Sequence, residues 1–76
     1  MSKLPAISGQ EAARAFEKLG YKRTRQKVSH LRMHHPSDSN RKPLTIPIHH
    51  KDLGKGLLRK LCRDASVTPS ELAELL

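Results

Sequence analysis

The sequence predicts an α+β fold in the order helix–strand–strand–strand–helix, followed by a short C-terminal helix. Three observations predict it. Apolar residues recur at helical spacing in two segments, one near each end of the chain. Between these segments the period changes to two, which is typical of half-buried strands. Clusters of turn residues separate the segments. We expect a three-stranded antiparallel sheet with the helices packed on one face, because this arrangement buries every apolar side.

The first helix is predicted over residues 9–19. Ser8 and Glu11 have the spacing of a capping box, in which each residue satisfies a backbone N–H of the other. Apolar residues then follow at helical spacing, namely Ala12, Ala15, Phe16 and Leu19. Gly20 is a natural stop for this helix.

Three strands are predicted over residues 21–26, 30–34 and 44–49. In the second, Leu31 and Met33 alternate with polar residues, so His30, Arg32 and His34 are expected on the sheet face that carries no helix. The first strand is too charged for its faces to be assigned. Turn residues at 36–43 predict a hairpin connection. Pro47 lacks an amide hydrogen, which favours a sheet edge or a bulge.

The second helix is predicted over residues 53–65, with Asp52 as a plausible N-cap and Cys62 as a small buried hydrophobic residue. Thr68 and Glu71 repeat the capping-box spacing, so a third helix is expected to start after Thr68. Residues 1–76 are expected to form one domain, because a chain this short supports a single core.

The chain has 15 Lys and Arg against 7 Asp and Glu, giving a formal charge of +8. This balance indicates a polyanionic partner. A single cysteine excludes an internal disulfide and a cysteine-rich zinc site. No segment resembles a signal peptide or a membrane span. We therefore expect a cytoplasmic protein with no membrane partner, whose commonest polyanion would be nucleic acid.

The window from Lys18 to Ser37 contains six Lys and Arg, three His and no Asp or Glu. An imidazole among cations can move a proton on a phosphodiester that the cations hold. RNA cleavage is therefore the hypothesis, with His30 as the general base that deprotonates a ribose 2′-hydroxyl. Its expected RNA-binding neighbours are Arg25, Lys27, Ser29 and Arg32. The residues alone leave open that His30 is an ordinary surface histidine.

The remaining histidines, His34, His35, His49 and His50, compete as acid or base and invite a metal site. His30 and His34 would lie about 13 Å apart on an extended strand, too far to bind one ion. A cross-strand pairing of His34 or His35 with His49 or His50 stays possible. We expect no metal and no other cofactor. The cations of the second helix, Lys55, Arg59, Lys60 and Arg63, either touch RNA or only solvate a helix face.

Three motifs in order resemble the HicA (YcfA-like) toxins of bacterial type II toxin–antitoxin systems. They are residues 25–30 (RQKVSH), 46–49 (IPIH) and 53–59 (LGKGLLR). The resemblance covers about residues 4–76. It implies a double-stranded-RNA-binding-domain-like αβββα fold and a ribosome-independent mRNA interferase, an endoribonuclease neutralised by a HicB-type antitoxin. The catalytic histidine of the family falls on His30.

One departure from the family pattern is Val28, where the family usually has glycine. A β-branched residue resists positive φ and close backbone approach to phosphate. Either this turn is reachable with negative φ, or the activity or substrate preference is altered. Ser66 replaces a second frequent glycine, at a helix end only. The alternative function is a non-catalytic RNA-binding module of the same fold, which would be served equally well by Lys at position 30.

Overall fold

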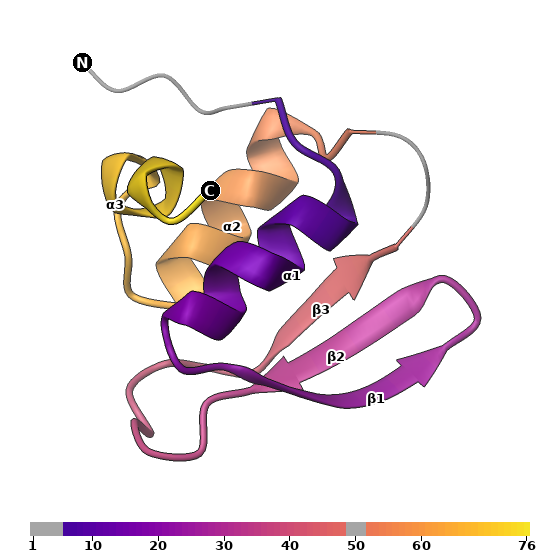
Figure 1. Cartoon of the computed structure of the whole chain (residues 1–76), viewed down its shortest axis with the longest axis vertical. Helices are drawn as coiled ribbons and strands as arrows, with labels where there is room; N and C mark the ends of the chain where they lie inside the picture. The colour runs from indigo at the N-terminus through magenta and orange to yellow at the C-terminus, as the bar shows by residue number, and fades with distance from the viewer. Residues whose placement is uncertain (1–5, 49–51) are drawn as a thin grey trace.

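The structure is a computed structural model that describes residues 6–48 and 52–76. Its elements in chain order are α1 (Gly9–Lys18), β1 (Lys22–Lys27), β2 (His30–His34), β3 (Leu44–Pro47), α2 (Lys55–Asp64) and α3 (Pro69–Glu74) (Figure 1). The strands form one antiparallel sheet in the order β1-β2-β3. The predicted α+β fold and its element order are confirmed.

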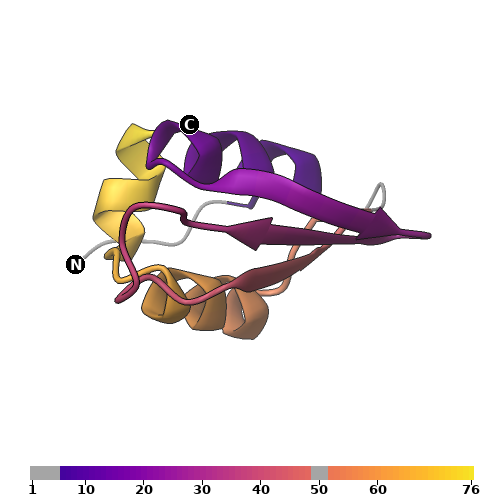
Figure 2. The ribbon, with the colours of Figure 1, turned by 90° about the horizontal axis from the view of Figure 1, so that it is seen from below.

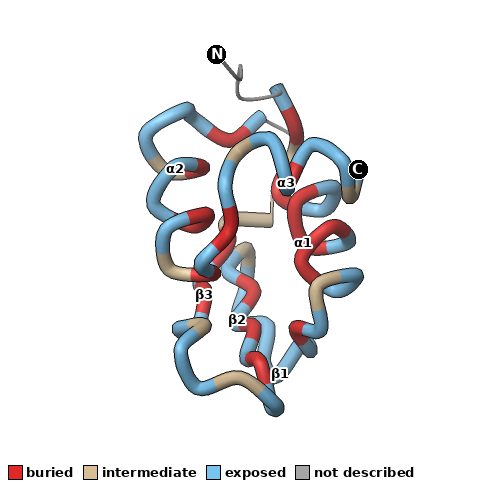
Figure 3. Tube along the Cα trace, turned by 90° about the vertical axis from the view of Figure 1, so that its left-hand side faces the viewer, coloured by how far each residue is buried: buried red, intermediate tan, exposed pale blue. Residues whose placement is uncertain are grey.

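The helices α1 and α2 lie on one side of the sheet (Figures 1 and 2). Between the two layers is a core of fully buried side chains, namely Phe16, Leu31, Met33, Leu44, Ile46, Leu58 and Leu72. In Figure 3 the buried stretches of helices and strands face each other. The opposite face of the sheet is covered by no helix of the described residues, and this exposure is what makes the face available for binding.

Both predicted capping boxes are present. The Ser8 hydroxyl accepts from the Glu11 amide at 3.2 Å, and the Thr68 hydroxyl accepts from the Glu71 amide at 3.1 Å. The reciprocal carboxylate bonds reach back to the backbone N–H of each capping residue. These caps start α1 and α3 where the sequence places them.

The N-terminus of α2 differs from the prediction. The N-cap is Gly54, with no side-chain cap, and Asp52 instead forms an isolated bridge with Ser8. The Leu53 amide also donates to the Ile7 carbonyl at 2.8 Å. Residues 52 and 53 are therefore held in extended backbone by the chain segment before α1, so the helix begins only at Lys55. The assignment of Asp52 as N-cap is wrong.

The strand β3 is shorter than predicted, ending at Pro47, while His49 and His50 lie outside the described residues. Because β3 is an edge of the sheet, the expected edge position of Pro47 is confirmed. The hairpin connection between β2 and β3 is tied to the C-terminus of α2. Arg41 Nη1 donates to the Ala65 carbonyl at 2.6 Å, and the Lys42 amide donates to the Asp64 carbonyl at 2.7 Å.

The β1–β2 hairpin closes through the two residues Val28 and Ser29. Val28 has φ 55° and is 89% exposed at the hairpin tip, so the alternative of a negative-φ turn is wrong. A β-branched residue in the left-handed region is strained, and two-residue hairpins that need positive φ favour glycine or asparagine there. Ser66 also has positive φ, 57°, just after the C-cap of α2, a position that favours glycine.

Val28→Gly is expected to raise the free energy of unfolding by about 1 kcal/mol, because it relieves the left-handed strain by more than it frees the unfolded chain. The melting temperature should rise by about 4–8 °C, measured by circular dichroism. Val28→Ala keeps a Cβ and should gain less. A glycine variant no more stable than the parent would contradict the assignment of strain to this turn.

Candidate functional site

The helix-free face of the sheet is lined by alternate residues of β2. Leu31 and Met33 are buried beneath the helices, whereas His30, Arg32 and His34 are exposed. Side chains of a strand alternate between its two faces. The predicted orientation of these three polar residues, away from the core, is therefore confirmed.

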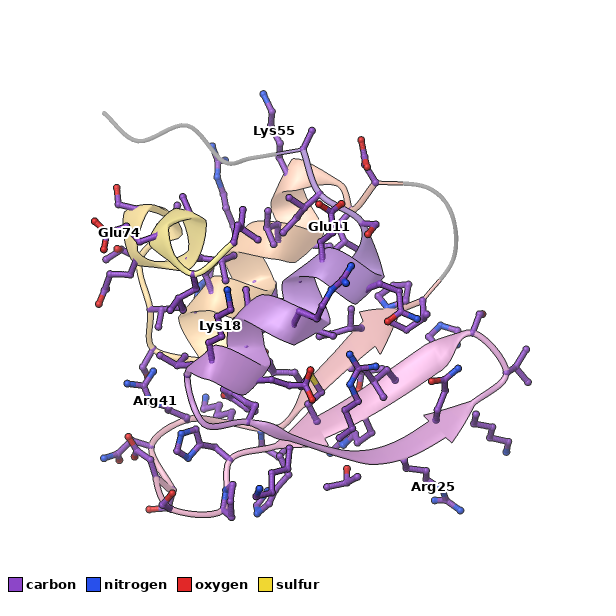
Figure 4. The ribbon with its side chains drawn as sticks, viewed as in Figure 1. Glu11, Lys18, Arg25, Arg41, Lys55 and Glu74 are labelled. Carbon is purple, nitrogen blue, oxygen red and sulfur yellow. The ribbon has the colours of Figure 1, made fainter. Side chains whose placement is uncertain are left out.

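Residues of β1 reach the same face through a bulge. The pairing register sets Lys22 opposite His34, Arg25 opposite Arg32, and Lys27 opposite His30, and shifts between Arg23 and Arg25. Directly opposite residues share one face. Six side chains thus form what we call the basic face: Lys22, Arg25, Lys27, His30, Arg32 and His34. In Figure 4 the labelled Arg25 projects from β1 on the side away from the helices.

The extra residue of this bulge is Thr24, whose hydroxyl donates to the Arg32 carbonyl at 3.1 Å. In a regular strand Tyr21, Arg25 and Lys27 would share a face, because all three have odd numbers. Tyr21 is nevertheless buried, and its hydroxyl donates to the Lys42 carbonyl at 2.8 Å. The bulge changes the alternation within the segment 21–27, so that the tyrosine enters the core while Arg25 and Lys27 face solvent.

In the described part of the chain, the cations of the basic face lack acidic partners. Among residues 6–48 and 52–76, no carboxylate forms an ion pair with Lys22, Arg25, Lys27 or Arg32. Arg23 points to the helix side, where it pairs with Glu17 at 3.2 Å. Arg25 and Arg32 lie directly opposite each other, which is destabilising for like charges. An anion bound between them would relieve that repulsion.

Two of the predicted RNA-binding residues have further contacts. Arg32 Nη1 donates to the Thr45 hydroxyl at 3.1 Å, which orients its guanidinium over the sheet. Ser29 lies in the hairpin loop beside His30, and its carbonyl accepts from the Ile48 amide. His30 itself is exposed, with Lys27 opposite on β1 and Pro47 opposite on β3. The structure thus brings His30, Lys27, Arg25 and Arg32 together on one surface.

The other histidines are distributed differently. His34 is at the far end of β2, about 13 Å from His30 along the strand. His35 is buried: its Nε2 donates to the Leu19 carbonyl at 3.0 Å, and its ring meets the Tyr21 ring edge-on at 5.2 Å. Gly20, with φ 111°, leaves room for that ring, because a Cβ there would lie 2.5 Å from Nε2. His35 therefore fastens the end of α1 to the sheet.

Two other side chains with reactive groups, Cys62 and Tyr21, are buried in the core. Cys62 is buried as predicted, and desolvation raises the pKa of its thiol. Burial likewise raises the pKa of Tyr21 to about 12. The exposed cations Lys55, Arg59, Lys60 and Arg63 project from α2, on the helix side of the sheet, and Lys60 pairs with Asp64 at 2.9 Å. These α2 cations are separate from the basic face.

Across the described ranges 6–48 and 52–76, no three His, Cys, Asp or Glu side chains are grouped to hold a metal ion. His49 and His50, whose cross-strand pairing with His34 or His35 the sequence left open, lie outside those ranges. A hollow of about 200 Å³ lies between α1 and the C-terminal residues, and none of the predicted site residues borders it. In the same described part of the chain, no helix is long and apolar enough to cross a membrane.

A small α+β domain with an unpaired cationic face around a solvent-exposed imidazole is suited to binding and acting on a polyanion. Residues 9–67 match the family described as HicA toxin of bacterial toxin–antitoxin systems. The match covers well over half of the chain, so the chain belongs to the HicA toxin family and is a toxin that pairs with an antitoxin. No curated protein matches it.

His30→Ala and His35→Ala are expected to affect stability very differently. Loss of the buried ring and its bond to Leu19 should lower the free energy of unfolding of His35→Ala by about 2–3 kcal/mol. His30→Ala should stay within about 0.5 kcal/mol of the parent, as exposed substitutions do. Urea unfolding followed by circular dichroism measures both. Equal destabilisation would refute the structural assignment of His35.

Proposed function

We propose that this toxin is an endoribonuclease, an mRNA interferase that cuts RNA without a metal ion and without the ribosome. The observation that carries the proposal is the exposed imidazole of His30 within the unpaired basic face, directly opposite Lys27. Membership of the HicA toxin family supports it. The substrate also supports it chemically, because RNA carries its own nucleophile, the 2′-hydroxyl, beside every phosphate.

In the proposed reaction, His30 accepts the proton of the 2′-hydroxyl. The 2′-oxygen then attacks the adjacent phosphorus, and the bond from phosphorus to the 5′-oxygen breaks. The products are a 2′,3′-cyclic phosphate and a 5′-hydroxyl end. Proton transfer by a positioned side chain contributes roughly 10²- to 10⁴-fold to such a rate, which an exposed imidazole can supply near neutral pH.

The remaining residues of the site hold the substrate and stabilise charge. Arg25 and Arg32 face each other across β1 and β2, so a phosphate between them would contact both guanidinium groups. The bond to Thr45 on β3 holds the Arg32 guanidinium over the open face of the sheet. Ser29, in the loop next to His30, offers a hydroxyl to a phosphate oxygen. Charge that develops on the phosphorane would be stabilised by these groups.

The basic face also indicates what kind of protein partner would inhibit the toxin. We propose that a HicB-type antitoxin silences the toxin by covering the basic face with complementary acidic or polar groups. Both proteins would act in the cytoplasm, where mRNA is found. We also propose that residues 1–76 form a single HicA-like domain, which the family match over residues 9–67 supports.

The decisive test is cleavage of RNA by the purified toxin in EDTA, compared with His30→Ala. We expect wild type to yield fragments that end in 2′,3′-cyclic phosphate and His30→Ala to bind RNA but leave it intact. His34→Ala is the matched control, since it removes an imidazole from the same strand and face; it should cut within a few-fold of wild type. Equal cleavage by His30→Ala would leave only a binding module, or a different base.

Salt dependence tests the binding surface. Each phosphate contact that is lost should flatten the slope of log affinity against log salt by about 0.7 for single-stranded RNA. We therefore expect Arg25→Ala to flatten the slope, measured by fluorescence anisotropy with His30→Ala as background to prevent cleavage. Arg59→Ala removes an exposed cation of α2 and should leave the slope unchanged. The opposite result would move the RNA site to α2.

A further inference from the structure

The reaction proposed above leaves one proton unassigned. The departing 5′-oxygen would leave as an alkoxide unless a group on the protein protonates it as the bond breaks. General acid catalysis of this kind follows the same geometric rule as general base catalysis, which is reach of the atom concerned. The donor must also approach from another direction than the base, because the attacking and leaving oxygens lie roughly in line through the phosphorus.

The side chain that meets these conditions is Lys27. It lies directly opposite His30 in the pair that closes the two-residue hairpin loop, so their Cβ atoms are about 5 Å apart. It comes from the neighbouring strand on the same face and is exposed. Among the described residues no carboxylate is paired with it. The ammonium has three rotatable donors on a flexible stem.

The other candidate donors are poorer. Lys22 is paired with His34 at the far end of β2, so it is as remote from His30 as that histidine. Arg25 and Arg32 carry guanidinium groups, which are not deprotonated in proteins. His34 lies about 13 Å along the strand from His30, too far to serve the same phosphate. His35 is buried and bonded to Leu19. Tyr21 is also buried, with its hydroxyl committed to the Lys42 carbonyl.

We propose that Lys27 is a catalytic residue, the general acid of this site; the inference rests on the proposed ribonuclease function. As the 2′-oxygen, deprotonated by His30, forms its bond to phosphorus, the bond to the 5′-oxygen breaks and its electron pair stays on that oxygen. The oxygen takes a proton from Lys27 Nζ. His30 is left protonated and Lys27 neutral. Exchange of one proton with solvent at each group restores the starting state.

The test compares two substrates that differ in one atom. One is an RNA that wild type cuts; the other has sulfur in place of the bridging 5′-oxygen at the same linkage. A thiolate leaves without protonation. Lys27→Arg keeps the positive charge but removes the releasable proton. This variant should cleave the oxygen substrate about 100-fold more slowly than wild type, a loss at the lower end of general acid contributions. Its rate of cleavage of the sulfur substrate should stay within about threefold of wild type.

Matched variants separate this role from binding. His30→Ala should cleave neither substrate, because the general base is needed whatever the leaving group. Arg25→Lys keeps a cation on the same strand and face and should affect both substrates equally. If Lys27→Arg slows both substrates equally, Lys27 binds or stabilises charge and is not the acid. If it slows neither, the acid is elsewhere, with His49 and His50 the next candidates.

Failure of the ribonuclease proposal itself looks different. In that case wild type cuts neither substrate in EDTA, and the result is visible before any variant of Lys27 is compared. Binding of uncleaved RNA is measured separately. Lys27→Arg should bind this RNA as wild type does, which would show that the variant is folded. Loss of that binding in Lys27→Arg, with its charge intact, would also overturn the assignment.

Discussion

The arrangement of this protein depends on a conflict between the two ends of the segment 21–27, which contains β1. At one end the ring of Tyr21 packs edge-on against Phe16 and His35 in the core. At the other end Lys27 is paired with His30 on the open face. In a regular strand, residues 21 and 27 would point to the same side of the sheet. The extra residue Thr24 resolves the conflict, and its hydroxyl satisfies the Arg32 carbonyl beside the bulge.

Among the described residues, some cations outside the basic face have acidic partners, unlike those on it. Arg23, the β1 cation on the helix side of the sheet, is paired with Glu17, and in the 36–43 connection Arg41 is paired with Asp38. Arg41 also satisfies the Ala65 carbonyl at the end of α2, where a cation is favourable for the helix dipole. The cations of the basic face have no such neutralising partners among the described residues, so the binding potential is concentrated around His30.

Much of the fold, and the faces of β2, could be predicted from the sequence, because the signals that determine them are local. The Ser8–Glu11 and Thr68–Glu71 caps and the alternation of His30 to His34 each depend on spacing within a few residues. The faces of β1 could not be predicted, since its six residues are all exposed and a bulge leaves no mark in a charged strand. The start of α2 at Lys55 could not be predicted either, because it depends on a long-range bridge between Asp52 and Ser8. The burial of His35 depends equally on a distant carbonyl, that of Leu19.

The outer side of β1 is an edge of the sheet, with backbone groups that face no further strand of the described chain. Such edges invite pairing with another polypeptide, the first step toward aggregates. Here four of the six β1 residues carry positive charge, so a second copy that aligned its own β1 would meet strong repulsion. The composition that attracts a polyanion therefore also keeps copies of the toxin apart. A partner that neutralises these cations removes this protection, and must cover or sterically block the edge itself.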